Sequence, residues 1–454
     1  VNRGLMQLFG FNHADAIFCF KRVIEIDPDC PFAYFGISYS AGPHYNLMEI
    51  SEDQYKEANL YLIKAQEKKH LGFDWEQDLI QALTKRYSDP MPLDEKSLQE
   101  HLANFRVAMK DVYEKYPNNL EIASMYAESV MNLRPWQLWD KAGNPFPEAV
   151  EAREVLFKAW KIGYHPLLAH LIIHVLELSP FYRDALTVAD DLLKNTQGIG
   201  HLLHMPSHIY IQVGDYQKSV HCNELAIKAD TYTTKRIGVN NFTTFYRAHN
   251  VHFLIWAAMF QGDFDLAYKY SMFMIEEVIT EEVVKGDPEN MEFFYHAFLH
   301  VLIRFGKWEE ILALSPVKRP DFEITEAFMY YSRVLAFAVK GRVDEAEKEL
   351  ALYKELLKVI PQKRRIGNND CIRVFEVCTN MAEGELLYRK KEYDIAFEKL
   401  RKAVSLNDEL IYDEPWDYMM PPRHALAALL LENGRLEESE EVYKHDLKTY
   451  PDNI

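Results

Sequence analysis

Cysteine is scarce in this chain: 454 residues contain five, an odd number without CxxC spacing. A disulfide framework would need an even, regularly spaced set, and a thiolate zinc site would need CxxC pairs. The sequence indicates neither of these. It favours instead a soluble protein of a reducing, cytoplasmic compartment.

Positive charge is also in deficit. Lys and Arg number 51 against 69 Asp and Glu, the formal net charge is −18, and no basic run offsets it locally. This balance opposes the counterion release that drives binding to nucleic acids, and it disfavours anionic membrane surfaces. We therefore expect no nucleic-acid partner and no membrane partner.

Long apolar runs and standard catalytic motifs are missing as well. No apolar run in the sequence reaches the ~20 residues that cross a bilayer. There is no GxSxG, GxxxxGK[ST] or HExxH, and no GxGxxG that opens a helix after a strand. The sequence therefore lacks the motifs that identify serine hydrolases, P-loop nucleotide-binding proteins, zincins and dinucleotide-binding proteins. Val1 in place of Met indicates a processed or trimmed start, which could hide a targeting segment.

What the chain does contain is an internal repeat. The segment FNHADAIFCFKRVIEIDPDC, residues 11–30, has a small residue, an aromatic and a helix stop where a short helical hairpin needs them. It resembles the second helix of a tetratricopeptide repeat. Similar segments begin with a turn residue at Gly214, Gly262, Gly306, Gly341, Lys390 and Gly434. Apolar residues then recur at helical spacing and strand signals are almost absent, which predicts an all-α, tetratricopeptide-like right-handed superhelical solenoid of helix pairs.

This solenoid is expected to be continuous, with four parts. Residues 1–50 form N-terminal hairpins, and residues 51–150 an irregular helical insertion where prolines interrupt the pattern. Residues 151–310 are histidine-rich repeats that form the site, and residues 311–454 are C-terminal repeats.

Histidine is concentrated, with nine of the 17 between residues 165 and 252. The repeats can be aligned on the residue that opens each second helix, which is Ala185, Ser219, Ala267, Ile311, Ala346, Ala396 or Ser439. We call the position fifteen residues earlier the first slot and the position eleven residues earlier the second slot. The first slots hold His170, His204, His252, His296, Tyr331, Met381 and His424. The second slots hold His174, His208, Trp256, His300, Leu335, Glu385 and Ala428.

The two slots are four residues apart, so they share one face of the first helix of each pair. In tetratricopeptide arrays, which the chain resembles, that face lines the concave groove. Imidazoles at i and i+4 can also reach one metal ion at about 2.0–2.2 Å. The predicted metal ligands are the slot histidines of residues 151–310 and two neighbours on the same face: His170, His174, His201, His204, His208, His249, His252, His296 and His300. Pro206 either kinks the helix of His204 and His208 or marks its first turn.

Longer strings resemble a widespread group of uncharacterised, mostly bacterial tetratricopeptide-repeat proteins with HxxxH and HMPSH motifs. They are HPLLAHLIIHVLELSP (165–180), GIGHLLHMPSHIYIQVGDY (198–216), YRAHNVHFLIWAAMFQGDF (246–264), residues 412–447, and DPDCPFAYFGISYSAGPHYN (27–46). The resemblance implies that these strings form one site, and it implies no activity. The chain departs from the group at Glu414-Pro415-Trp416, where the group usually has Pro-Pro after the acidic residue.

The favoured function is a metalloenzyme with a mononuclear or dinuclear transition-metal site. Imidazole-rich, thiolate-poor ligands suit copper, zinc, nickel or iron and argue against magnesium and calcium. Histidines outnumber carboxylates in the slots, which favours copper and an oxygen-activating oxidoreductase acting on a small organic substrate. The candidate catalytic residues are Glu177, Glu414, Arg423 and His424. Glu177 or Glu414 would act as the base if the ion is zinc, and Arg423 and His424 lie on the rim formed by residues 412–424, where they would support turnover of the substrate.

Two alternatives stay open. Zinc in the same site would suit hydrolysis, with three ligands and an open position. A scaffold that binds a peptide or protein partner in the groove is the other, although the slots carry no Lys or Arg to hold a peptide.

Overall fold

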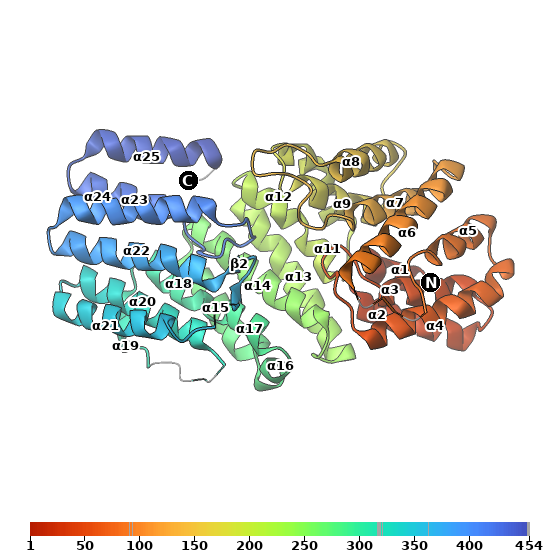
Figure 1. Ribbon diagram of the computed structural model, residues 1–454, viewed down its shortest axis with the longest axis horizontal. Helices are drawn as coiled ribbons and strands as arrows, with labels where there is room; N and C mark the ends of the chain where they lie inside the picture. The colour runs from red at the N-terminus through yellow and green to blue at the C-terminus, as the bar shows by residue number, and fades with distance from the viewer. Residues whose placement is uncertain (90, 93, 316–318, 320, 362, 452–454) are drawn as a thin grey trace. The chain divides into compact units, whose positions relative to one another are not determined.

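The computed structural model describes all residues except 90, 93, 316–318, 320, 362 and 452–454, and the described chain is helical almost throughout (Figure 1). The two short strands β1 (Arg365–Ile366) and β2 (Asn369–Asp370) pair antiparallel in a single hairpin. None of the described helices is both long and apolar enough to span a bilayer.

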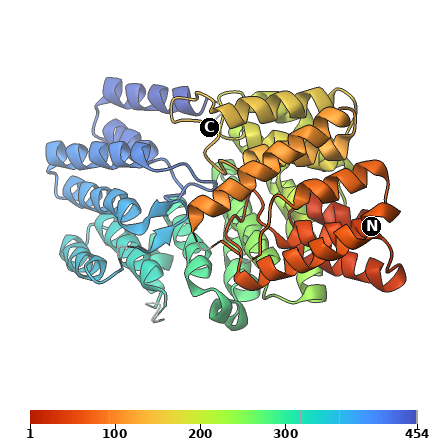
Figure 2. The same cartoon turned by 45° about the vertical axis from the view of Figure 1, so that its right-hand side comes forward.

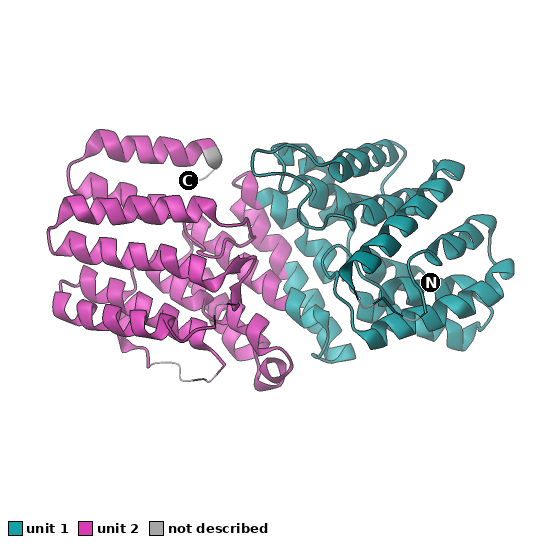
Figure 3. Cartoon of the chain, in the orientation of Figure 1, with its two compact units in different colours: residues 1–210, 225–246 teal, residues 211–224, 247–454 magenta. Residues whose placement is uncertain are grey.

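The chain divides into two compact units (Figure 3). Unit 1 comprises residues 1–210 and 225–246, and unit 2 comprises residues 211–224 and 247–454. The helices of unit 1 are α1 (Asn2–Phe9), α2 (His13–Ile26), α3 (Pro31–Ala41), α4 (Glu52–Lys68), η1 (Lys69–Leu71), α5 (Asp74–Leu83), α6 (Glu95–Lys115), α7 (Leu120–Met131), α8 (Pro147–Trp160), α9 (Pro166–Leu176), η2 (Tyr182–Ala185), α10 (Leu186–Asn195) and α11 (Gly200–His204).

Three helices carry residues of both units: α12 (Pro206–Gln212), α13 (Tyr216–Ile237) and α14 (Phe242–Gln261). Unit 2 continues with α15 (Phe264–Phe273), the π-helical turn η3 (Met274–Val278), α16 (Glu281–Gly286), α17 (Pro288–Tyr295), α18 (Ala297–Arg304), α19 (Trp308–Ala313), α20 (Glu323–Val339), α21 (Val343–Leu357), α22 (Cys371–Arg389), α23 (Tyr393–Glu409), α24 (Pro422–Glu432) and α25 (Leu436–Thr449).

Consecutive helices pack as pairs within each unit. Helices α2 and α3 form such a pair in unit 1, and α20 with α21, α22 with α23 and α24 with α25 form three in unit 2 (Figures 1 and 2). The turn that closes the first helix has a left-handed residue with positive φ in repeat after repeat. These residues are Gly214 (φ 72°), Gly262 (φ 78°), Gly306 (φ 63°), Gly341 (φ 73°), Lys391 (φ 65°) and Gly434 (φ 81°). The predicted class, an all-α, tetratricopeptide-like solenoid of helix pairs, is confirmed. The four predicted segment boundaries stay a prediction.

Helix α9 is the central helix of unit 1. Every residue from Leu167 to Leu176 is buried, because α1, α7, α8 and α10 all pack against it. Pro166 occupies its first turn, where the missing N–H costs nothing. Two polar side chains, His170 and His174, are thus carried into an apolar interior.

The short helix α11 fits tightly in the same interior. A Cβ atom on Gly200, its first residue, would lie 1.9 Å from a carboxylate oxygen of Asp230. A Cβ atom on Gly10 would lie 2.4 Å from Ile199, just before α11. Both glycines let the backbone approach closely and fix the place of the histidines on α11.

Pro206 marks the start of a helix. It is the first residue of α12, and Met205 separates α12 from α11. His201 and His204 therefore lie on α11, whereas His208 lies on α12.

Candidate metal centre

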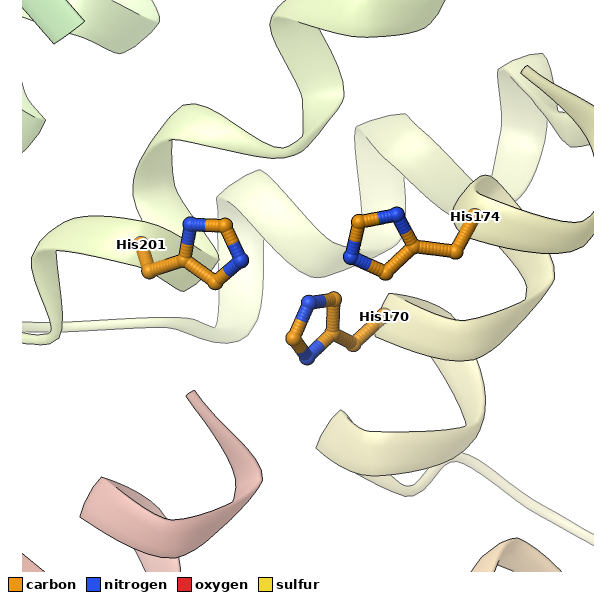
Figure 4. A group of neighbouring side chains, drawn as sticks. All are labelled: His170, His174 and His201. Atoms are coloured by element: carbon orange, nitrogen blue, oxygen red, sulfur yellow. The ribbon is translucent and has the colours of Figure 1, made fainter. Parts of the chain in front are cut away.

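Three buried histidines of unit 1 converge on one point. His170 and His174 come from successive turns of α9 and His201 comes from α11, and Figure 4 shows their rings turned toward one another. Each offers one ring nitrogen, and these three nitrogens lie within 4.8 Å of one another. All three side chains are at least 96% buried, with exposed fractions of 0%, 1% and 4%. This group, which we call the histidine triad, is the strongest candidate site in the described chain.

Hydrogen bonds fix the tautomers of the two α9 histidines. The Nδ1 of His170 lies 2.7 Å from the carbonyl oxygen of Phe9, and the Nδ1 of His174 lies 2.8 Å from Oε1 of Glu177. Both oxygens can only accept, the latter as part of a carboxylate, so each Nδ1 carries the proton and donates it. Each Nε2 is then unprotonated, and its lone pair is buried without a hydrogen-bond partner.

The third histidine has a different partner. The Nδ2 of Asn46 lies 3.1 Å from Nε2 of His201 and 3.3 Å from the hydroxyl oxygen of Tyr246. The Tyr246 ring stacks on the His201 ring with centroids 4.3 Å apart. Asn46 and Tyr246 therefore set both the orientation and the position of the His201 ring.

Burial controls the charge of the triad. It lowers the pKa of His170, His174 and His201 well below the usual value near 6.5, and the neighbouring histidines lower it further. The imidazoles are consequently neutral at physiological pH, which is the form that binds metal ions.

Glu177 joins the triad to a second pair of histidines. Its Oε1 accepts from His174, and its Oε2 lies 3.2 Å from Nδ1 of His208. The Nε2 atoms of His204 and His208 are 2.8 Å apart, so one of them donates its proton to the other. The His174 and His208 ring centroids are 6.5 Å apart, so the two rings lie close together, and their sharing of one metal site stays a prediction.

The wall of the site includes residues that no histidine slot or spacing predicts. The ring centroids of Phe11 and His170 are 4.4 Å apart, and those of Tyr45 and His174 are 4.9 Å apart. His44 contacts Phe11 at 4.8 Å and lies 4.2 Å from the His13 ring. Burial is the main cause of a lowered pKa at both histidines. It lowers the pKa of His44 well below the usual value and that of His13 to about 3. The only sequence signal for His44 is its place in the 27–46 string of the family resemblance.

The other predicted ligands belong to unit 2. The Nε2 of His252 lies 3.3 Å from Sδ of Met419, and the His249 ring contacts Phe253. His296 donates from Nδ1 to the Glu292 carbonyl at 3.2 Å, and its ring is 5.6 Å from that of His300. Within unit 2 alone, the described residues bring no three His, Cys or carboxylate groups as close together as the triad.

The three remaining candidates also lie in unit 2. Glu414 accepts a hydrogen bond from the Tyr412 hydroxyl. Arg423 forms a two-point ion pair with Asp408, with one contact at 2.7 Å. His424 lies 3.1 Å, through Nε2, from a carboxylate oxygen of Asp446, and it lines a cavity described below.

Comparisons with known proteins give only structural similarity. No family model and no curated protein matches the chain. A structure described as human IFIT1 dimer with m7Gppp-AAAA is similar at 13% identity and a TM-score of 0.36, covering 98% of this chain and 88% of that one. The crystal structure of the P58(IPK) TPR domain is similar at 15% identity and a TM-score of 0.21, covering 95% of this chain and 97% of that one.

Proposed function

We propose that unit 1 binds a transition-metal ion through His170, His174 and His201. The observation that carries this proposal is the pair of Nε2 lone pairs on α9, which are buried without a hydrogen-bond partner beside a third imidazole. An unpaired buried polar atom costs free energy, so two unpaired lone pairs beside a third imidazole in an apolar interior need a reason to persist. A metal ion supplies that reason, because it accepts both lone pairs of the α9 histidines together with one from His201.

The geometry is close to that of a ligand set. Nitrogen–metal bonds of 2.0–2.1 Å place tetrahedral ligand nitrogens about 3.4 Å apart. Nitrogens within 4.8 Å reach this spacing by movements of an ångström or so. The Asn46 amide must release Nε2 of His201 if that nitrogen is the ligand.

The donor set favours copper or zinc. Three neutral imidazoles without thiolate suit Cu, Zn or Fe better than Mg or Ca. Glu177 hydrogen-bonds to His174 and supplies negative charge close to the site. Such a carboxylate orients the ligand ring and raises its basicity.

Elemental analysis of protein purified without an affinity tag tests the proposal. After reconstitution we expect one equivalent of copper, zinc or iron, and loss of that equivalent in the variant His174→Gln/His201→Gln. The matched control is His70→Gln, because His70 is exposed and outside the site. No metal after reconstitution, or full occupancy of the double variant, would overturn the proposal.

An ion held by three imidazoles keeps a position for water or substrate. That open position supports the enzymatic extensions of the proposal, oxygen activation with copper or hydrolysis with zinc, on a small organic substrate. Spectroscopy of the copper-loaded protein and hydrolase assays of the zinc-loaded protein distinguish them.

A second candidate function is a scaffold for a peptide or protein partner. The observation that favours it is the array of tetratricopeptide-like helix pairs, whose slots in residues 311–454 hold one histidine only. A metal-free protein with full stability would favour the scaffold over the metal centre.

A further inference from the structure

Unit 2 contains a cavity of about 390 Å³, within the range of roughly 300–1,000 Å³ typical of small-molecule sites. It is lined by helices α18, α20, α22 and α24, by the first residue of α19, and by the segment that leads into α24. Six lining residues are the slot residues of three successive repeats: Tyr331, Leu335, Met381, Glu385, His424 and Ala428.

The slot residues of these three repeats therefore line one cavity in unit 2. Their side chains differ in chemistry from the histidines of the triad. Tyrosine, methionine, leucine and alanine occupy slots where the earlier repeats have histidine. These residues do not make a ligand set for a metal ion, whereas they do make an apolar wall for an organic molecule.

One cation in this cavity lacks a negative partner. Arg304, at the end of α18, is half-buried, and among the described residues its guanidinium interacts with His424, Tyr216 and Tyr443 but forms no ion pair with a carboxylate. Its Nη1 lies 3.4 Å from Nδ1 of His424, and burial lowers its pKa. A half-buried guanidinium that is hydrogen-bonded to an imidazole is an incomplete charge arrangement.

The other charged groups of the cavity are already paired. Arg389 donates to Glu385 at 2.8 Å and lies 3.5 Å from Glu432. Only Arg304 therefore contributes an uncompensated positive charge, which matches one negative charge rather than a phosphate dianion.

The rest of the cavity suits an apolar body. The hydroxyls of Tyr331 and Tyr418 hydrogen-bond to each other at 2.5 Å, so their rings rather than their hydroxyls are left for a ligand. Trp308 and Leu335 add further apolar wall. An extended peptide would bury amide groups against this wall without partners, which is costly.

We propose that this cavity binds a small amphipathic monocarboxylate, with its carboxylate on Arg304 and its apolar or aromatic body between α20, α22 and α24. This goes beyond the metal centre, because it rests on other residues and requires no ion.

Isothermal titration calorimetry with 4-phenylbutyrate and with its neutral amide tests the proposal. The acid should bind about tenfold or more tightly than the amide, because the amide loses the charge-assisted bond to Arg304. In Arg304→Gln this difference should vanish. The matched control Arg342→Gln, which removes an exposed arginine paired with Glu345, should bind the acid as the unchanged protein does.

A second variant guards against a folding defect in Arg304→Gln. Ala428 is exposed and lines the cavity, so Ala428→Trp should fill the cavity and abolish binding while the circular dichroism spectrum is kept. Equal binding of acid and amide, no binding of either at millimolar concentration, or undiminished binding to Ala428→Trp would overturn the proposal. A tetrapeptide with a free carboxylate that binds more tightly than 4-phenylbutyrate would also overturn it, in favour of a peptide.

Discussion

Glu177 is a single carboxylate buried among histidines, with an exposed fraction of 1%. It accepts from His174 and lies beside His208, so one side chain sets the tautomer of a triad member and joins the two histidine groups. A carboxylate in this role stabilises positive charge on the ring and on any ion bound to it.

We therefore expect Glu177→Gln to weaken metal affinity about 10–100-fold while the stoichiometry at saturating metal stays the same. The glutamine oxygen still accepts from His174, but the negative charge is lost. A chelator-competition titration measures the affinity. Glu128→Gln is the control, because Glu128 is a buried carboxylate of unit 1 that binds Tyr39 instead. An unchanged affinity for Glu177→Gln would show that this carboxylate does not support the ion.

At the residue scale, the sequence can predict which side chains lie together only where spacing along one helix decides it. His170 and His174 are four apart on one helix, so their convergence could be predicted. His201 depends on a separate helix whose place is fixed by Gly200 and Asp230, which are 30 residues apart in sequence. His44 lies in a loop, where the sequence has no helical periodicity. The spacing of residues therefore does not predict that His44 lies near the site.

At the scale of elements, the turn between helices is the most regular feature. Gly341 and Gly434 have φ values of 73° and 81°, where an L side chain is strained by contact with the following carbonyl. Lys391 takes the same conformation at φ 65°, so it carries a cost that its glycine counterparts avoid.

Lys391→Gly should consequently raise the free energy of unfolding by about 1 kcal/mol, and Gly341→Ala should lower it by a similar amount. Lys391 is exposed and a Cβ on Gly341 would contact nothing, so the backbone alone decides both effects. Urea unfolding followed by circular dichroism measures the two changes. A loss of stability in Lys391→Gly would contradict this account of the turn.

The repeat register was predictable for the same reason that the turns are regular. Counting back from the second helix finds residues that line one groove in unit 2, such as Tyr331 and Met381. This counting identifies the slot residues, but it does not show which other side chains lie beside them in the fold. Whether histidines from two helices share a site depends on the tilt of those helices and on the distance between them. The residue interval along one helix does not determine either quantity.

At the scale of the whole molecule, the buried histidines bear on stability at low pH. Burial lowers the pKa of His165 and of His296 to about 4, and it also lowers the pKa of each triad histidine well below the usual value. The unfolded chain takes up protons near pH 6.5, before the folded chain does. Each such histidine therefore contributes stability that is fully present above about pH 6.5 and is lost as the pH falls toward its folded value.

The two units should respond to acid differently. In unit 1, burial lowers the pKa of His13, His44, His165, His170, His174 and His201. In unit 2, it lowers the pKa of His252, His296 and His300. Burial also raises the pKa of carboxyl groups in both units: of Glu128 in unit 1, and of Glu292 to about 7 and Asp413 to about 6 in unit 2. A carboxyl group with a raised pKa favours the folded state as the pH falls, so these groups oppose the histidines in both units.

We accordingly expect metal-free protein to lose protection in unit 1 before unit 2 when the pH is lowered from 7 to 5. Each buried histidine contributes up to about 1.4 kcal/mol per pH unit below 6.5, and the larger set in unit 1 makes its loss steeper. Hydrogen exchange followed by mass spectrometry, corrected for intrinsic rates, reports the two units separately. His165→Gln should make the loss in unit 1 shallower, because one proton-linked group is removed. Equal loss in both units, or a stability that does not change between pH 6.5 and 5, would show that these histidines are not held neutral by burial.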